Sequence, residues 1–187
     1  MAVKEVKLST IEEVLTTLTT AEFNDALKRN RSAFLFRGLP NVSYKLTTSL
    51  RWNCKGKAGE LEPSILRNFS KYAASTSPLN SCWEQMVIGQ HHGLPTRLMD
   101  WTYSPLAALH FATSGEDITG MNQHDAVVWA IDITEMNTLL PAKYQKVLND
   151  ERAYLFTIDM LDRVAKDLTT YDNDMGEDGI VLLEPPS

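Results

Sequence analysis

The residues best suited to chemistry lie in one run from Trp83 to Trp101, which reads WEQMVIGQHHGLPTRLMDW. It holds two adjacent histidines, an arginine and two carboxylates. A histidine can transfer protons near neutral pH, and the planar fork of an arginine matches phosphate or carboxylate groups. On a helix, His91 and His92 would point about 100° apart, so we expect one of them to act rather than both.

A second arginine, Arg37, stands at the end of a short apolar run that predicts a buried strand. Arg37 and Arg97, with His91 or His92 and Asp100, form a set that can hold a small anionic ligand. An open alternative is purely structural: Arg97 and Asp100, three residues apart in a tight loop, pair with each other, and a histidine caps the preceding helix.

Further side chains can complete such a ligand site. Gly38 follows Arg37 in a turn, and Thr48 belongs to a hydroxyl-rich stretch from Tyr44 to Trp52 that predicts a poor strand and a plausible pocket wall. Trp101 or Trp52 can stack on a planar part of the ligand.

The periodicity of apolar residues predicts the elements that must position these side chains. Ser9 with Glu12 forms a candidate capping box. Asn80 or Ser81 can open the helix that Gly93 closes, and Ser104-Pro105 is a good helix start. Helices are expected after a cap at Ser9, over residues 21–29, 60–74 and 81–92, from Ser104-Pro105 onward, and over residues 137–148 and 153–168.

Strands are expected near residues 33–37, 126–132 and 179–184. The second is apolar on both faces, which predicts a central place in the sheet. Together these patterns indicate one α+β domain over residues 1–187, with a small mixed sheet and surrounding helices; an irregular or doubly wound α/β fold is the alternative. The side chains expected in its core are Trp83, Leu106, Leu109, Phe111, Val128 and Ile131.

Composition limits the classes of function. The 187 residues carry a formal net charge of −6, which argues against a broad nucleic-acid footprint while leaving room for a local basic site. Cys54 and Cys82 lack the spacing of a zinc ribbon or a disulfide framework. No apolar stretch is long enough for a membrane span or a signal peptide, so we expect a soluble, cytoplasmic protein without membrane partners.

Other chemistries find little support in the sequence. The four histidines lack the spacing of HExxH or HxxxH, so no metal site is expected. Neither cysteine has a local helper for nucleophilic catalysis, and no GxSxG elbow is present. The glycine loops that bind nucleotide cofactors are absent, and no cofactor is expected. The arginine at a strand end followed by Thr47-Thr48-Ser49 is weakly similar to elements of ADP-ribosyltransferases, but the paired glutamates of their catalytic loop are missing.

Several linked motifs resemble the FRG domain family, named for its Phe-Arg-Gly motif. They cover about residues 33–131 and are Phe36-Arg37-Gly38, the stretch from Tyr44 to Arg51, the stretch from Gln90 to Thr102, and Ser104 to Ala112. The sequence departs from the family pattern at Thr48, His92 and Met99. Arg37, Arg97 and Asp100 all match.

The resemblance implies a name rather than a reaction, because the family is known as a presumed domain without an assigned activity. It favours a functional role over a purely structural one for four residues: Arg37, His91, Arg97 and Asp100. It also implies that members can continue into a further Arg- and Gln-rich motif, so this chain, which ends at Ser187, is either a natural short form or a truncated one. An enzyme that processes the ligand and a module that only binds a ligand or a protein partner both remain open.

Overall fold

The computed structural model describes residues 3–20, 23–24, 29–30, 33–73, 81–114, 123–176 and 179–184. Their contacts divide the chain into two compact units. Unit 1 comprises residues 1–44 and 101–131, and unit 2 comprises residues 45–100 and 132–187. The combination of many helices with a few short strands confirms the α+β class.

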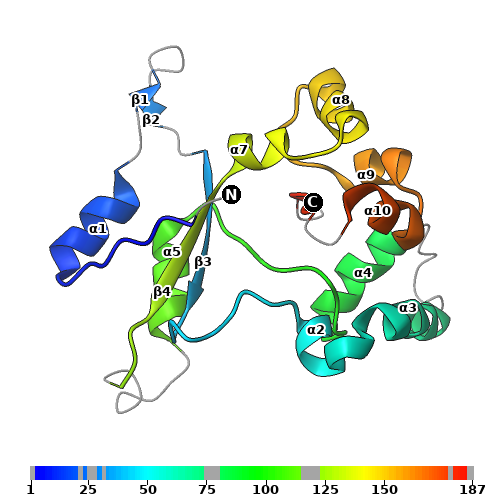
Figure 1. Ribbon diagram of the computed structural model, residues 1–187, viewed down its shortest axis with the longest axis horizontal. Helices are drawn as coiled ribbons and strands as arrows, with labels where there is room; N and C mark the ends of the chain where they lie inside the picture. The colour runs from blue at the N-terminus through cyan, green and yellow to red at the C-terminus, as the bar shows by residue number, and fades with distance from the viewer. Residues whose placement is uncertain are drawn as a thin grey trace. The chain divides into compact units, whose positions relative to one another are not determined.

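Unit 1 is built on a pair of strands, β3 (Phe34–Leu39) and β4 (Val127–Asp132), with helix α5 (Pro105–Thr113) packed along β3 (Figure 1). Ser104 caps α5 by accepting a hydrogen bond from the Ala107 N–H, as its sequence predicts. Because β4 belongs to a two-stranded sheet, the predicted central position of this strand is wrong.

The strand β3 lies very close to α5 because both elements carry small residues at the contact. A Cβ built on Gly38 would stand 1.8 Å from the Ala108 carbonyl oxygen and 2.6 Å from the Ala112 nitrogen. Both alanines are buried, whereas Leu106 and Phe111, which we expected in the core, are 50% and 62% exposed. The helix is apolar on every side, so periodicity alone could not show which face packs inward.

Two further predictions for unit 1 need correction. The first helix, α1 (Ile11–Thr19), begins one residue later than expected, because Thr10 and Glu13 form the capping box in place of Ser9 and Glu12. The helix expected at 21–29 is wrong where the structure describes it, since β1 (Phe23–Asn24) pairs antiparallel with β2 (Arg29–Asn30). The remainder of that segment lies outside the described residues.

Unit 2 is helical. Its elements in chain order are α2 (Ser49–Cys54), a 3-10 turn at Lys55–Lys57, α3 (Ala58–Ala73), α4 (Cys82–His91), α7 (Ile133–Thr138), α8 (Ala142–Glu151), α9 (Ile158–Val164) and α10 (Leu168–Met175). The stretch from Tyr44 to Trp52, expected to be a poor strand, forms no strand and enters α2 at Ser49. Pro141 separates α7 from α8, and an extended segment around Phe156 precedes α9, so the two long helices expected here are four shorter ones.

The core of unit 2 forms around α4. Trp83, expected in the core, is 3% exposed and donates its indole N–H to the Ala165 carbonyl at 2.7 Å. Tyr144 on α8 and Phe156 pack edge to face in the same cluster. The strand expected at 179–184 is a single parallel bridge between Leu183 and Phe156, because this segment joins unit 2 rather than the β3–β4 sheet. Of the other expected core residues, Leu109, Val128 and Ile131 are half-buried.

Candidate functional site

The end of α4 brings the histidine pair to the surface through a Schellman motif. The Gly93 N–H donates to the Gln90 carbonyl at 2.9 Å, and the Leu94 N–H donates to the Gly89 carbonyl at 2.8 Å. Gly93 has φ +81°, a left-handed conformation that favours glycine. His91 is the last residue of the helix and His92 its C-cap, and both are exposed. The predicted end of the helix is therefore confirmed.

Beyond this turn, Thr96 organises the loop from a buried position. Only 1% of Thr96 is exposed. Its hydroxyl donates to the Gln90 side-chain oxygen at 2.5 Å and accepts the Leu98 N–H at 3.2 Å. Its backbone exchanges hydrogen bonds with the Ser49 hydroxyl and accepts the Leu50 N–H, which attaches the loop to the start of α2.

The same network reaches one of the predicted catalytic residues. The Gln90 side-chain amide donates to Oδ1 of Asp100 at 2.7 Å. Asp100 is exposed, so a series of hydrogen bonds runs from a buried hydroxyl to a carboxylate at the surface. Because Thr96 holds the Gln90 oxygen, the amide nitrogen is directed at the carboxylate. The loop thus presents Asp100 in a fixed orientation.

Arg97 is held by two carboxylates from other helices. Its Nε and Nη2 contact both carboxylate oxygens of Glu62 on α3, and its Nη1 lies 2.5 Å from Oδ1 of Asp172 on α10. The Tyr171 ring lies 5.8 Å from the guanidinium carbon. Burial opposes the positive charge, but hydrogen bonds to Glu62 and Asp172 outweigh that effect and hold the Arg97 pKa above its ordinary value.

Glu62 is 2% exposed, so this carboxylate depends on Arg97 for its neutralisation. The guanidinium in turn joins α3, the loop after α4 and α10. The partners found here, Glu62 and Asp172, are not the Asp100 that the structural alternative expected. Sequence reasoning missed both of them, although a carboxylate at Glu62 on the same helix face as buried Leu66 is a signal that a cation must lie nearby.

Thr48, a predicted ligand-binding residue, serves as the N-cap of α2. Its hydroxyl accepts the Arg51 N–H at 3.3 Å. This contact explains why the hydroxyl-rich stretch ends in a helix rather than a strand. Within unit 2 the structure thus gathers His91, His92, Arg97 and Asp100 on one loop and gives Thr48 a local capping role.

The remaining predicted residues belong to unit 1. Phe36 is buried and exchanges backbone hydrogen bonds of 2.8 and 2.9 Å with Thr102, which fixes the strand that carries Arg37. Gly38 provides the close contact with α5. Arg37 and Trp101 are half-buried. A cleft that unites Arg37 with Arg97 stays a prediction.

Among the described residues, no group of three or more histidine, cysteine, aspartate or glutamate side chains is arranged to hold a metal ion. Within the same residues, no helix is long and apolar enough to cross a bilayer. Cys82 is half-buried, and burial with the nearby Asp162 and Asp167 charges raises the pKa of its thiol to about 11. Such a thiol is a poor nucleophile at neutral pH.

The chain is an α+β protein whose motif residues lie in two places: Arg37 and Gly38 belong to β3, and His91, His92, Arg97 and Asp100 lie at and after the end of α4. Comparison with family models gives a match to the FRG domain over residues 32–119. This match confirms the resemblance seen in the sequence. Comparison with curated proteins gives no match, and comparison with solved structures gives none either.

Proposed function

We propose that the FRG domain binds a small phosphorylated or nucleotide-like ligand through the loop from Gln90 to Asp100. The observation that carries the proposal is the hydrogen-bond series from Thr96 through Gln90 to Asp100. A buried network that ends on an exposed carboxylate is a preorganised acceptor, suited to hydroxyl groups of a ribose or sugar.

In this proposal the histidine pair supplies proton transfer. His91 and His92 lie on the same turn as Gln90 and are exposed to solvent. If the ligand is processed, one of these imidazoles is the general acid or base and Asp100 orients the reacting hydroxyl. If the ligand is only sensed, the same residues bind it without chemistry.

Arg37 stays the predicted contact for the ligand's anionic group, with Gly38 beside it on β3 and Trp101 as the predicted ring for stacking. These three assignments rest on the FRG motifs. Arg97, which the motifs also suggest as a ligand contact, already faces Glu62 and Asp172. We therefore assign Arg97 chiefly to the frame that holds the loop. A ligand could reach its guanidinium only on the side that faces Asp172, which is exposed.

The test is a thermal-shift screen of nucleotides, NAD⁺ and phosphorylated metabolites with the wild type, Asp100→Asn and Arg37→Ala, followed by product analysis of any hit. We expect a hit whose stabilising effect is lost in both variants. Consumption of the hit identifies an enzyme, and a transferred ADP-ribose would identify the transferase alternative. A hit that survives unchanged identifies a sensor. Equal shifts in all three proteins would refute the assignment of these residues.

A second candidate, a protein-interaction module, is favoured by α5. Leu106 and Phe111 are large apolar side chains that stay 50% and 62% exposed. Apolar surface of this kind is typical of protein contacts. Replacing both with glutamine would leave ligand binding unchanged but abolish binding to a protein partner, which separates the two functions.

A further inference from the structure

The charges of this acidic protein are unevenly distributed along the chain. Residues 45–71 carry six basic and two acidic side chains, a net charge of +4. Because the whole chain has a net charge of −6, the residues outside this segment have a net charge of −10. One of those two acidic groups, Glu62, is buried and paired with Arg97. The exposed surface of this segment is therefore more basic than its formal charge indicates.

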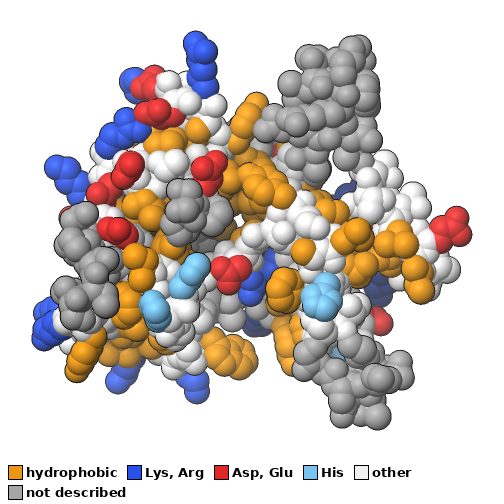
Figure 2. All heavy atoms as spheres, turned by 180° about the vertical axis from the view of Figure 1, so that it is seen from behind, with side chains coloured by type: hydrophobic (Ala, Val, Ile, Leu, Met, Phe, Trp, Pro, Cys, Tyr) orange, Lys and Arg blue, Asp and Glu red, His pale blue; other side chains and the backbone are white. Residues whose placement is uncertain are grey.

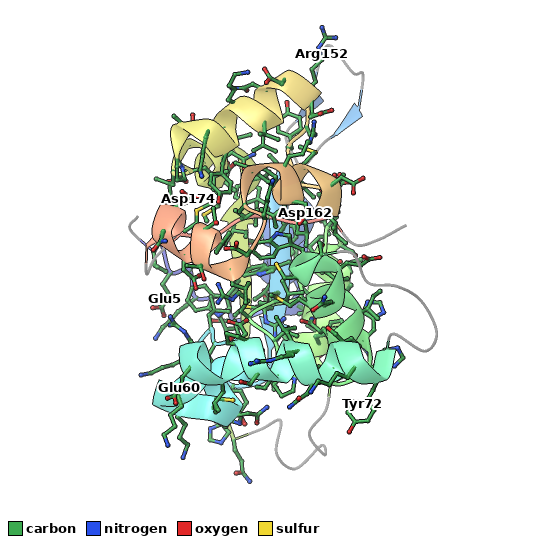
Figure 3. The ribbon with its side chains drawn as sticks, turned by 90° about the vertical axis from the view of Figure 1, so that its right-hand side faces the viewer. Glu5, Glu60, Tyr72, Arg152, Asp162 and Asp174 are labelled. Atoms are coloured by element: carbon green, nitrogen blue, oxygen red, sulfur yellow. The ribbon has the colours of Figure 1, made fainter. Side chains whose placement is uncertain are left out.

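The basic segment folds into one continuous piece of unit 2. Helix α2, the 3-10 turn and the start of α3 contact one another. Figure 3 shows α2 beneath α3 at the Glu60 end, with nitrogen-tipped side chains projecting there. Figure 2 shows lysine and arginine side chains along the lower left of the molecule, where α2 and α3 lie in that view.

The four residues Arg51, Trp52, Lys55 and Lys57, here called the α2 corner, are all exposed. Trp52 is 74% exposed, an unusual state for the largest apolar side chain. Lys55 has φ +51°, a conformation rarely taken by residues other than glycine. It ends α2, and the 3-10 turn Lys55–Lys57 that follows contacts this helix. The nearest acidic residue along the chain is Glu60, three residues after Lys57.

We propose that the α2 corner binds single-stranded nucleic acid, with Trp52 stacking on a base and Arg51, Lys55 and Lys57 contacting phosphates. An exposed aromatic ring among cations is the combination that binds single strands with little regard to sequence. A duplex keeps its bases stacked, so it offers Trp52 no free base face. This inference does not depend on the proposed small-ligand function. Trp52, which the sequence offered as an alternative to Trp101 for stacking on that ligand, is assigned to this site instead.

The same charges limit the size of the site. The remaining −10 repels a long polyanion, so contacts are confined to a few phosphates. For three phosphate contacts on a single strand, log K should fall with log[salt] with a slope of about −2. A local, salt-sensitive site of this size is compatible with the net charge, which argues only against a broad nucleic-acid footprint.

The test is fluorescence anisotropy with a labelled 20-nucleotide oligo-dT at 50 and 200 mM salt. We expect salt-dependent binding by the wild type, weakened about tenfold or more at 50 mM salt by Lys55→Ala with Lys57→Ala. Trp52→Ala should weaken it roughly fivefold or more, whereas Trp52→Phe should retain most of it. The matched control is Lys4→Ala with Lys7→Ala, which removes the same charge from exposed positions in unit 1 and should bind like the wild type.

Three results would overturn the proposal. One is no anisotropy change by the wild type at 50 mM salt. Another is equal weakening by the two lysine pairs, which would indicate a net-charge effect. The third is binding to phosphatidylserine vesicles but not to the oligonucleotide, which would indicate a membrane surface. Circular dichroism of each variant checks that the helices remain intact.

Discussion

At the scale of single residues, Arg97 has the largest structural consequence. Its guanidinium neutralises Glu62, a carboxylate that is 2% exposed. Removing one partner of a buried pair leaves an uncompensated charge, which typically lowers stability by about 3–5 kcal/mol. We therefore expect Arg97→Ala to lower the free energy of unfolding by that amount in urea titrations.

Asp172→Asn is the matched control for this prediction. Asp172 is 55% exposed, and exposed ion pairs contribute only about 0–1 kcal/mol. The variant should unfold close to the wild type. If Arg97→Ala were also within about 1 kcal/mol of the wild type, Arg97 would not be part of the frame.

At the scale of elements, the packing of β3 on α5 depends on Gly38. A Cβ at this position would enter the α5 backbone, 1.8 Å from the Ala108 oxygen, and neither backbone can move away cheaply. We expect Gly38→Ala to destabilise unit 1 by at least about 2–3 kcal/mol. Gly56→Ala is the control, because nothing lies within 4 Å of a Cβ there. Equal melting temperatures for the two variants would contradict the close contact.

A second element-scale prediction concerns acid. Asp132 caps α7 by accepting the Thr134 and Glu135 N–H groups, and its hydrogen bond with the Thr134 hydroxyl is the main reason its pKa lies below the ordinary value. The folded state thus favours the charged form. This stabilisation is complete above the unfolded pKa, near 4, and is lost as the pH falls through the folded pKa.

Asn caps helices about as well as Asp but does not titrate in this range. We therefore expect a smaller fall in melting temperature between pH 7 and pH 3 for Asp132→Asn than for the wild type. An identical fall in both proteins, measured by circular dichroism at the two pH values, would show that the cap does not depend on the charge.

The elements also show what a sequence can reveal. The predictions for both ends of α4 and for the start of α5 are confirmed because the signals are local: Ser81 and Ser104 cap, Pro105 starts a helix, and Gly93 ends one. The inward face of α5 was not predicted, because it is set by packing against Gly38, which is distant in sequence. The partners of Arg97 were missed for the same reason, since Glu62 lies 35 residues away.

At the scale of the whole molecule, the FRG domain covers residues 32–119, which leaves α7 to α10 outside the match. These helices still contribute to unit 2, because Asp172 contacts Arg97 and Ala165 accepts the Trp83 indole N–H. A chain cut after residue 131 would expose the apolar face of α4. We expect such a fragment to be insoluble or to bind a hydrophobic dye, whereas the full chain does neither; a soluble, dye-free fragment would contradict this.

In the proposed function, the loop from Gln90 to Asp100 presents Asp100 to a ligand, while Arg97 holds that loop to α3 and α10. The most direct measurement is calorimetric titration of the ligand found by the screen into wild type, Asp100→Asn and Asp172→Asn. We expect at least about tenfold weaker binding to Asp100→Asn, equivalent to one lost charged hydrogen bond, and unchanged binding to Asp172→Asn. Unchanged binding to Asp100→Asn, together with altered binding to Asp172→Asn, would place the ligand at the Arg97 edge and contradict the account.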